Sequence, residues 1–299
     1  MREFEGSLTK RLIGHSGPVY SCKFMHPDGD RMLISVSQDG TARLWSLDLF
    51  SCLAVFRGHN QPVWDVDVAP LGAGPYFATA SADRTARLWS VEHIQALRIF
   101  VGHLSDVNVV RFHPNGNYVI TGSADKTCRM WDIQSGKCVR LFSSHSRAVS
   151  ALAVSPDGRF LASGDYAGQI QVWDLAEGRL IKTVQPLSRA SSAVNGTTNA
   201  ATSNTASIYS LDFDRDGRLL AAAGADQIVR LWDVNKLLQN ANPSLLTPTN
   251  SSSTPNALPE DGLLSSYPTK STPIMRLNFT YRNILLAAGP FSPFEDQSV

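Results

Sequence analysis

A histidine, a hydroxyl residue, a carboxylate and a tryptophan recur together at fixed spacing along this chain. The sequence TGSADKTCRMWD contains Thr121, Asp125 and Trp131, and the pair Gly102-His103 lies upstream of it. An imidazole, a hydroxyl and a carboxylate are the groups that activate a nucleophile in hydrolytic enzymes. The first question is therefore whether this stretch performs catalysis or holds a strand in place.

The same groups return with a period in the low forties. Equivalent segments end at Trp45, Trp89, Trp131, Trp173 and Trp232, at steps of 44, 42, 42 and 59 residues. An active centre occurs once in a domain, so the repetition favours architecture over catalysis. A period of this length, with Gly-His at one end and Trp-Asp at the other, is typical of WD40 β-propeller repeats.

Each period predicts four short antiparallel strands. Apolar alternation is followed by Pro-Asp-Gly, Pro-Asn-Gly or Arg-Asp-Gly, which supply the positive φ of a tight hairpin. A third strand ends at the Trp, and CLAVF, ALRIF, CVRLF and LIKTV read as fourth strands. We therefore expect an all-β WD40 propeller with five full blades, in a family of seven-bladed members. Residues 271–291 predict the inner half of a further blade, and residues 8–16 the outer strand of a preceding one, so we expect an N-terminally truncated propeller.

In this fold the recurring groups predict a hydrogen-bonded quartet in each blade. The carboxylate accepts from the imidazole, the imidazole accepts from the hydroxyl, and the hydroxyl oxygen accepts from the indole N–H. Complete and partial quartets are predicted at His15, Ser35, Asp39 and Trp45; His59, Thr79, Asp83 and Trp89; His103, Thr121, Asp125 and Trp131; His145, Ser163 and Trp173; and Asp226 and Trp232. The fourth set has Ala167 at the position of the acid, and the fifth has Asn204 and Ala222 in place of the imidazole and the hydroxyl.

Composition argues against several classes of partner and cofactor. The formal net charge is +1, from 27 basic and 26 acidic residues, so no overall field attracts nucleic acid. The four Cys residues form no C-x-x-C pair, which predicts free buried thiols and no metal or other cofactor. The first residues lack the apolar core of a signal peptide, and no apolar run reaches the roughly 20 residues of a membrane span. We expect no membrane contact and no small-molecule substrate.

The predicted domain map is one incomplete propeller over residues 8–291 with two interruptions. Residues 185–207 are rich in Ser, Thr, Ala and Asn, and predict a disordered insertion. Residues 236–271 are rich in Pro, Ser, Thr and Asn, and predict a disordered loop before the last blade. Residues 292–299 are a tail.

Several stretches resemble one WD40 family closely. GHSGPVYSCKF, HIQALRIFVGHLSDVNVVRFHPNGNYVITGSADKTCRMWD and TKSTPIMRLNFTYRNILLAAGPFSP are similar to the propeller of the WD40-bearing TBP-associated factor of TFIID (subunit 5 type), which fungi share with SAGA. The resemblance implies a nuclear, non-catalytic scaffold in RNA polymerase II transcription initiation. It also implies histone-fold TBP-associated factors as partners. The resemblance does not distinguish one propeller surface from another as the binding site of a partner. It also does not distinguish a subunit of TFIID alone from one shared with SAGA.

Propellers also serve as ubiquitin-ligase receptors and as enzymes. A WD40 substrate receptor or adaptor of a ubiquitin ligase often carries Trp-Asp-x-Arg at the blade end, and no Arg follows any of these Trp residues at that distance. An enzyme needs a unique site, and the sequence has no G-x-S-x-G elbow, metal spacing or P-loop. Asp65 and Asp67 fit one face of a strand better than an acid–base pair. Trp64, off the repeated position, either packs between blades or anchors a partner.

Overall fold

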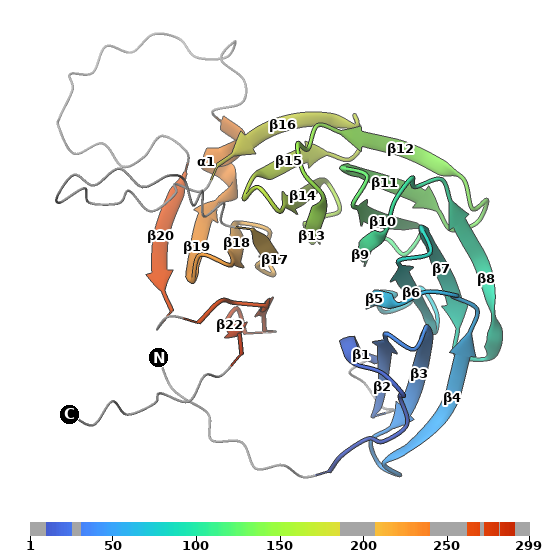
Figure 1. The fold of residues 1–299 in the computed structure, drawn as a ribbon. Helices are drawn as coiled ribbons and strands as arrows, with labels where there is room; N and C mark the ends of the chain where they lie inside the picture. Colours follow the sequence, from blue (N-terminus) through green and yellow to red (C-terminus); the bar gives the residue numbers. More distant parts are fainter. Residues whose placement is uncertain are drawn as a thin grey trace, which may run out of the picture. The chain divides into compact units, whose positions relative to one another are not determined.

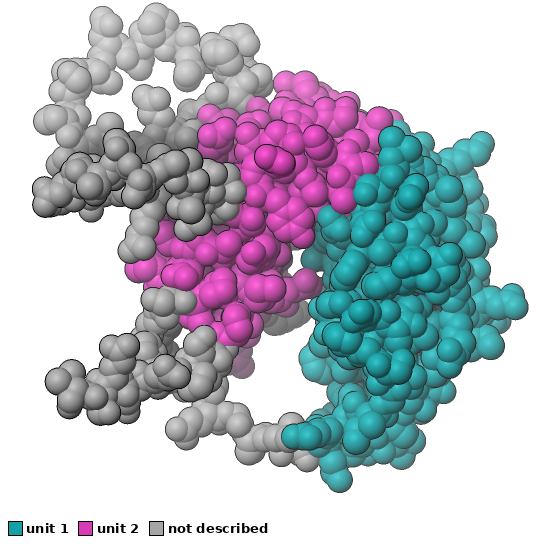
Figure 2. All heavy atoms as spheres, in the orientation of Figure 1, with its two compact units in different colours: residues 1–121, 130–139 teal, residues 122–129, 140–299 magenta. Residues whose placement is uncertain are grey.

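The computed structural model describes residues 10–25, 31–185, 207–239, 262–269, 272–280 and 282–290. The chain forms two compact units (Figure 2). Unit 1 comprises residues 1–121 and 130–139, and unit 2 comprises residues 122–129 and 140–299. Each unit is described by itself.

Unit 1 contains two complete antiparallel sheets in which each strand pairs with the next along the chain (Figure 1). The first sheet consists of β1 (Val19–Met25), β2 (Met32–Ser37), β3 (Thr41–Ser46) and β4 (Ser51–Arg57). The second consists of β5 (Val63–Val68), β6 (Tyr76–Ser81), β7 (Thr85–Ser90) and β8 (His93–Val101). This order is the predicted meander.

The third repeat forms a sheet of the same order, and the boundary between the units falls within its chain segment. Its strands are β9 (Val107–Phe112), β10 (Tyr118–Ser123), β11 (Thr127–Asp132) and β12 (Cys138–Ser143).

Unit 2 contains two more four-stranded meanders and a two-stranded sheet. The meanders are β13 (Val149–Val154), β14 (Phe160–Asp165), β15 (Ile170–Asp174) and β16 (Arg179–Val184), then β17 (Ile208–Phe213), β18 (Leu219–Gly224), β19 (Ile228–Asp233) and β20 (Leu263–Pro268). The two-stranded sheet pairs β21 (Arg276–Phe279) with β22 (Leu285–Ala288). These repeated antiparallel sheets confirm the all-β propeller fold class.

Apolar side chains between consecutive sheets form the core. In unit 1, Ile34 and Phe56 from the first sheet cluster with Phe77 and Trp89 from the second. In unit 2, Val172 from the fourth repeat clusters with Trp232 and other residues of the fifth. A sheet with one covered face leaves apolar area in water, so stacking consecutive sheets stabilises both.

First strands of consecutive repeats are also joined by polar contacts. In unit 1, Asp65 on β5 accepts hydrogen bonds from the Ser21 hydroxyl on β1, at 2.8 Å, and from the Arg111 guanidinium on β9. Asp67 accepts the Phe112 N–H at 2.8 Å. The two acids therefore bind neighbouring strands, a role that alternation within one strand does not reveal.

The same contact identifies the place of β21 in unit 2. Asp212 on β17 accepts the Phe279 N–H at 2.7 Å, and these residues occupy the repeat positions of Asp67 and Phe112. β21 therefore lies beside β17 in the same way that β9 lies beside β5. The two-stranded sheet of β21 and β22 is the inner half of a further repeat, within the predicted residues 271–291.

The structure corrects two predicted segments. Residues 236–271 are not one loop, because α1 (Val234–Gln239) extends into this range and β20 is the fourth strand of the fifth sheet. Val234 and Leu237 are buried, so the polar composition hid a packed turn of helix. No strand forms over residues 10–16, contrary to the outer strand predicted for residues 8–16. Residues 186–206, nearly all of the predicted insertion, and the predicted tail lie outside the described residues.

Candidate functional site

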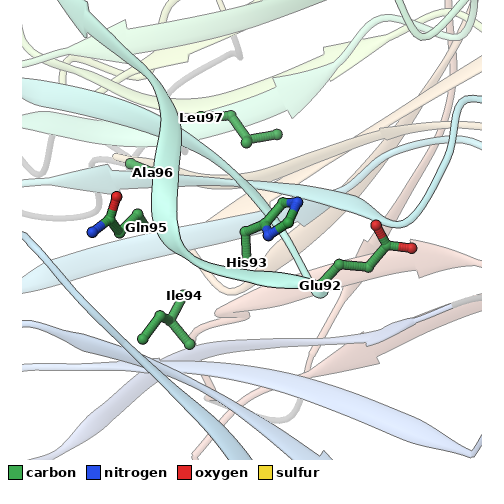
Figure 3. Close-up of a pocket in the computed structure, with 6 residues that line it drawn as sticks. All are labelled: Glu92, His93, Ile94, Gln95, Ala96 and Leu97. Carbon is green, nitrogen blue, oxygen red and sulfur yellow. The ribbon is translucent and has the colours of Figure 1, made fainter.

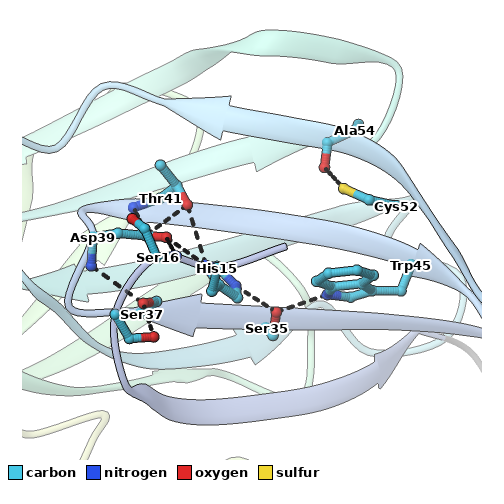
Figure 4. A network of polar contacts seen from close by, with 10 residues as sticks. His15, Ser16, Ser35, Ser37, Asp39, Thr41, Trp45, Cys52 and Ala54 are labelled. Atoms are coloured by element: carbon cyan, nitrogen blue, oxygen red, sulfur yellow. Dashed lines mark hydrogen bonds and ion pairs between the residues drawn. The ribbon is translucent and has the colours of Figure 1, made fainter. Parts of the chain in front are cut away.

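The quartet of the first repeat is a continuous hydrogen-bond chain (Figure 4). His15 Nδ1 lies 2.9 Å from Asp39 Oδ2, and His15 Nε2 lies 2.8 Å from Ser35 Oγ. Trp45 Nε1 donates to the same Ser35 oxygen at 2.8 Å. A carboxylate only accepts, so the proton of the imidazole is on Nδ1, and Nε2 accepts from the hydroxyl. Thr41, which the sequence analysis missed, donates its hydroxyl to Asp39 at 2.6 Å.

The second repeat has the same chain. His59 Nδ1 lies 2.7 Å from Asp83 Oδ2, and its Nε2 lies 2.8 Å from Thr79 Oγ1. Trp89 Nε1 donates to Thr79 at 2.9 Å, and the Thr85 hydroxyl donates to Asp83 at 2.6 Å.

In the third repeat the structure brings three predicted residues together in unit 1. His103 Nε2 lies 2.7 Å from Thr121 Oγ1, and Trp131 Nε1 donates to that oxygen at 2.9 Å. In unit 2, Asp125 accepts hydrogen bonds from the N–H and the hydroxyl of Thr127, at 3.0 and 2.7 Å.

The fourth repeat has an acid that the repeat alignment did not find. His145 Nδ1 lies 3.0 Å from Asp165 Oδ2, two residues before Ala167, and His145 Nε2 lies 2.7 Å from Ser163 Oγ. Trp173 Nε1 completes the chain at 2.9 Å from Ser163. The side chains of His145 and Asp165 are both 0% exposed, so this quartet is fully buried. Ala167 does occupy the repeat position of the acid, but the quartet is complete because Asp165 supplies the carboxylate.

One carboxylate here takes over the hydrogen bonds that two side chains make elsewhere. In the first repeat, Ser37 accepts the Asp39 N–H and Asp39 accepts the Thr41 N–H. In the fourth repeat, Asp165 stands at the position of Ser37 and accepts the N–H groups of Ala167 and Gln169, at 2.9 and 3.0 Å. The sequence does indicate this substitution, because Asp165 stands where the first three repeats have Ser37, Ser81 and Ser123.

The fifth repeat has a different polar contact. Asp226 forms an ion pair with Arg230, which is buried and lies in register with Ala222. Trp232 is 2% exposed. The predicted histidine position, Asn204, lies outside the described residues. Asp226 and Trp232 therefore lie in the same repeat, and the partner of Asp226 is Arg230.

The glycine before the histidine is required by packing. A Cβ atom on Gly14 would lie 2.5 Å from Arg43 Nη1 and 2.9 Å from Trp45 Cη2. Both approaches are shorter than van der Waals contact, so any side chain displaces the arginine and the indole. Gly58 has the same environment beside Arg87 and Trp89. Packing therefore requires glycine before His15 and His59, where an Arg and a Trp of the same repeat approach its Cα.

The hydrogen bonds of the quartets shift the ionisation of their members. Burial opposes ionisation of Asp83, but the hydrogen bonds from His59 and Thr85 outweigh it and lower its pKa to about 2. The pKa of Asp39 is lowered in the same way. Burial lowers the pKa of His59 against the opposing effect of Asp83, so the neutral imidazole is favoured.

This arrangement suits stabilisation better than catalysis. Each hydroxyl oxygen of the complete chains accepts an indole N–H and contacts an imidazole, and the indoles are at most 4% exposed. A nucleophile needs a face that is open to a substrate. The structural role of the quartets remains a prediction.

Other candidate groups are dispersed. Of the four cysteines, Cys128 alone is buried, and Cys22 and Cys138 are exposed, so the prediction of buried thiols was wrong for those two. The Trp64 ring lies against the Tyr20 ring at an interplanar angle of 51°, with the ring centroids 4.8 Å apart, which favours packing between first strands. Among the described residues, no group of three His, Cys, Asp or Glu side chains could hold a metal ion. No helix in the described part of the chain is long and apolar enough to cross a membrane.

A cavity of about 520 Å³ is lined by residues 92–97 at the start of β8 (Figure 3). The lining comes from one curved stretch of chain, where the pairing with β7 passes from Leu88–Arg98 to Ser90–His93. Glu92 and His93 are exposed. This notch lacks the converging polar groups of a ligand site.

These repeats match a known family model, and parts of the chain are similar to known proteins. The family model "WD domain, G-beta repeat" matches residues 6–46, 50–90, 94–132, 136–174 and 197–233. Transcription initiation factor TFIID subunit 5 of Encephalitozoon cuniculi is 57% identical over 60 residues, covering 20% of this chain and 10% of the relative. The Drosophila melanogaster protein of the same name is 48% identical over 52 residues, covering 17% and 7%. The SAGA complex/transcription factor TFIID complex subunit Taf5 of Schizosaccharomyces pombe is 44% identical over 56 residues, covering 19% and 8%.

Proposed function

The chain belongs to the WD domain, G-beta repeat family, and we propose that it is the repeat-bearing part of a TFIID subunit of the subunit 5 type. The aligned segments span a tenth or less of the relatives named above. Membership of the family identifies the repeats as a non-catalytic scaffold. The observation that carries the proposal is the recurrence of TFIID subunits among the relatives, in a microsporidian, a fly, a worm and a yeast.

In this proposal the repeats dock histone-fold TBP-associated factors and support initiation by RNA polymerase II in the nucleus. The printed name of the yeast relative includes SAGA, which extends the proposal to that co-activator. The quartets are satisfied inside the sheets, so a partner meets the loops and outer strands. Loops on a rigid framework are the usual place for such recognition. The ubiquitin-ligase alternative is not favoured, because no Arg stands three residues after any of the five repeat Trp residues.

Affinity purification of the full chain from nuclei of its own cells tests this proposal. We expect histone-fold TBP-associated factors among the proteins recovered, with SAGA subunits if the protein is shared. A variant with an exposed ion pair removed, Asp48→Ala, serves as a control, because the side chains of Asp48 and Arg31 are 61% and 72% exposed. Recovery of ubiquitin-ligase subunits without any histone-fold factor would reject the proposal.

A further inference from the structure

The loops at one end of the unit 2 strands carry exposed charge of one sign. These loops precede first strands or join second to third strands, and comprise residues 124–126, 146–148, 166–169, 207 and 225–227; we call them the loop face of unit 2. Lys126 and Arg147 are the exposed charged residues among them. The face therefore presents two cations to solvent.

The acids of the same loops are held by contacts within the fold. Asp125 accepts from the N–H and hydroxyl of Thr127, and Asp226 forms the ion pair with Arg230. Asp165 is buried against His145. Each of these carboxylates already has a partner within the fold, and Lys126 and Arg147 are the exposed charged groups of the loop face.

The repeat geometry predicts that the two cations lie on adjoining loops. In the first repeat, a Cβ atom on Gly40 would lie 3.2 Å from the His59 carbonyl oxygen and 3.4 Å from that of Gln61. Lys126 is the repeat equivalent of Gly40, and both have the same left-handed backbone, with φ of 71° and 77°. Arg147 is the equivalent of Gln61, two residues after the histidine. Lys126 therefore stands against the loop that carries Arg147.

Two tyrosines continue this surface. The Tyr166 N–H donates to the Ala148 carbonyl at 3.1 Å, directly after Arg147, and the Tyr166 side chain is 45% exposed. Tyr209 is half-buried on β17, and Ser207, two residues earlier, donates its hydroxyl to the Tyr166 carbonyl at 3.1 Å. Burial raises the pKa of Tyr166, and the nearby Tyr209 adds to this, so the Tyr166 phenol keeps its proton as a donor.

The loop of the fourth repeat differs from its equivalents in the acid and in the residue that follows it. Asp165 accepts from the His145 imidazole and from the backbone N–H groups of Ala167 and Gln169. The equivalent of Tyr166 in the first three repeats is Gln38, Ala82 or Ala124. Tyr166 is thus a large, half-exposed side chain at a position that is Gln or Ala in the first three repeats.

We propose that Lys126, Arg147, Tyr166 and Tyr209 form a docking surface for an acidic, extended segment of a partner protein. The guanidinium and ammonium groups complement carboxylates, and phenol hydroxyls donate to carboxylate or carbonyl oxygens. Tyrosine also adds apolar contact area at low entropic cost. Two cations with flanking phenols suit a short acidic peptide better than a nucleic acid, whose binding usually engages many phosphates. The proposal does not depend on which complex contains the chain.

Fluorescence anisotropy with the full chain and a labelled peptide of alternating Glu and Ser tests the surface directly. The matched neutral probe alternates Gln and Ser. We expect the acidic probe to bind and the neutral probe to bind at least about ten-fold more weakly, with binding of the acidic probe weakened by added salt. The Lys126→Gln/Arg147→Gln variant should lose about ten-fold or more in affinity for the acidic probe, and Tyr166→Ala should lose roughly five-fold.

The control variant Lys137→Gln/Arg179→Gln removes the same charge from exposed residues elsewhere and should bind like the parent. Thermal melting verifies that each variant is folded. Equal binding of the two probes, or an unchanged affinity in the Lys126→Gln/Arg147→Gln variant, would overturn the proposal. Tighter binding of a single-stranded oligothymidylate, lost in that same variant, would also overturn it and assign the surface to nucleic acid. These outcomes are independent of which proteins co-purify with the chain.

Discussion

Replacing Asp165 with Ala removes the carboxylate that the fourth repeat uses for three hydrogen bonds. The Asp165 carboxylate accepts hydrogen bonds from the His145 imidazole at 3.0 Å and from the backbone N–H groups of Ala167 and Gln169 at 2.9 and 3.0 Å. The side chain is 0% exposed, so water does not replace it without local opening. An unsatisfied buried donor costs about 1–3 kcal/mol, and this substitution leaves three donors without their acceptor.

We therefore expect Asp165→Ala to lower the free energy of unfolding by about 3–5 kcal/mol, a large part of a total that is typically about 5–15 kcal/mol. The melting temperature should fall by on the order of 10 °C for a chain of this size. Asp125→Ala, in the third repeat, should cost about 1–3 kcal/mol for its orphaned partners. Asp48→Ala is the control, because its contact with Arg31 is exposed and should contribute less than about 1 kcal/mol.

Chemical denaturation and thermal melting followed by circular dichroism provide the measurement. The reasoning fails if Asp165→Ala unfolds at the same denaturant concentration and temperature as the control. It also fails if Ala167→Asp rescues nothing when combined with Asp165→Ser, since that pair restores the arrangement of the first three repeats. Turnover of a small substrate that disappeared with a single altered quartet would refute the structural interpretation altogether.

Three further outcomes follow from packing and ionisation. Gly14→Ala should destabilise the fold by about 1–3 kcal/mol in thermal melting, because the new Cβ would lie 2.9 Å from the Trp45 ring. Burial raises the pKa of the Cys128 thiol well above its usual range, so maleimide labelling followed by mass spectrometry should modify exposed Cys138 in the native protein and leave Cys128 unmodified until unfolding. The pKa of Asp83 is lowered to about 2, from a reference value of 3.8, because hydrogen bonds outweigh burial. The contribution of Asp83 to the free energy of unfolding is therefore complete above pH 3.8 and is lost as the pH falls towards 2. Measurements of the free energy of unfolding against pH should show this loss in the parent and not in Asp83→Asn.

The sequence predicted the repeat architecture well because each repeat carries its own local determinants. Hairpin glycines such as Gly158 and Gly217 have φ of 73° and 69°, as tight turns require. Alternation and the period of the Trp residues then placed the strands of the four-stranded sheets, except the fourth strand of the fifth sheet, β20. The quartets were found for the same reason, since the spacing from His to Trp is set by strand length.

Composition was a poorer guide where packing decided the structure. The stretch from residue 236 reads as a polar loop, yet α1 buries Leu237 and β20 pairs with β19. Short segments like these are stabilised by the sheet that they cover, and their own propensity is weak.

By itself the sequence determined the number, order and type of the repeats, because periodicity and turn chemistry are local. Only the tertiary structure decided which atoms meet between distant positions. It showed that Asp165 replaces the acid missing at residue 167, and that Asp65 and Asp67 join neighbouring strands. A carboxylate reaches a partner through space along directions that depend on the backbone. A shift of two residues within a turn therefore preserves the contact while breaking the sequence pattern.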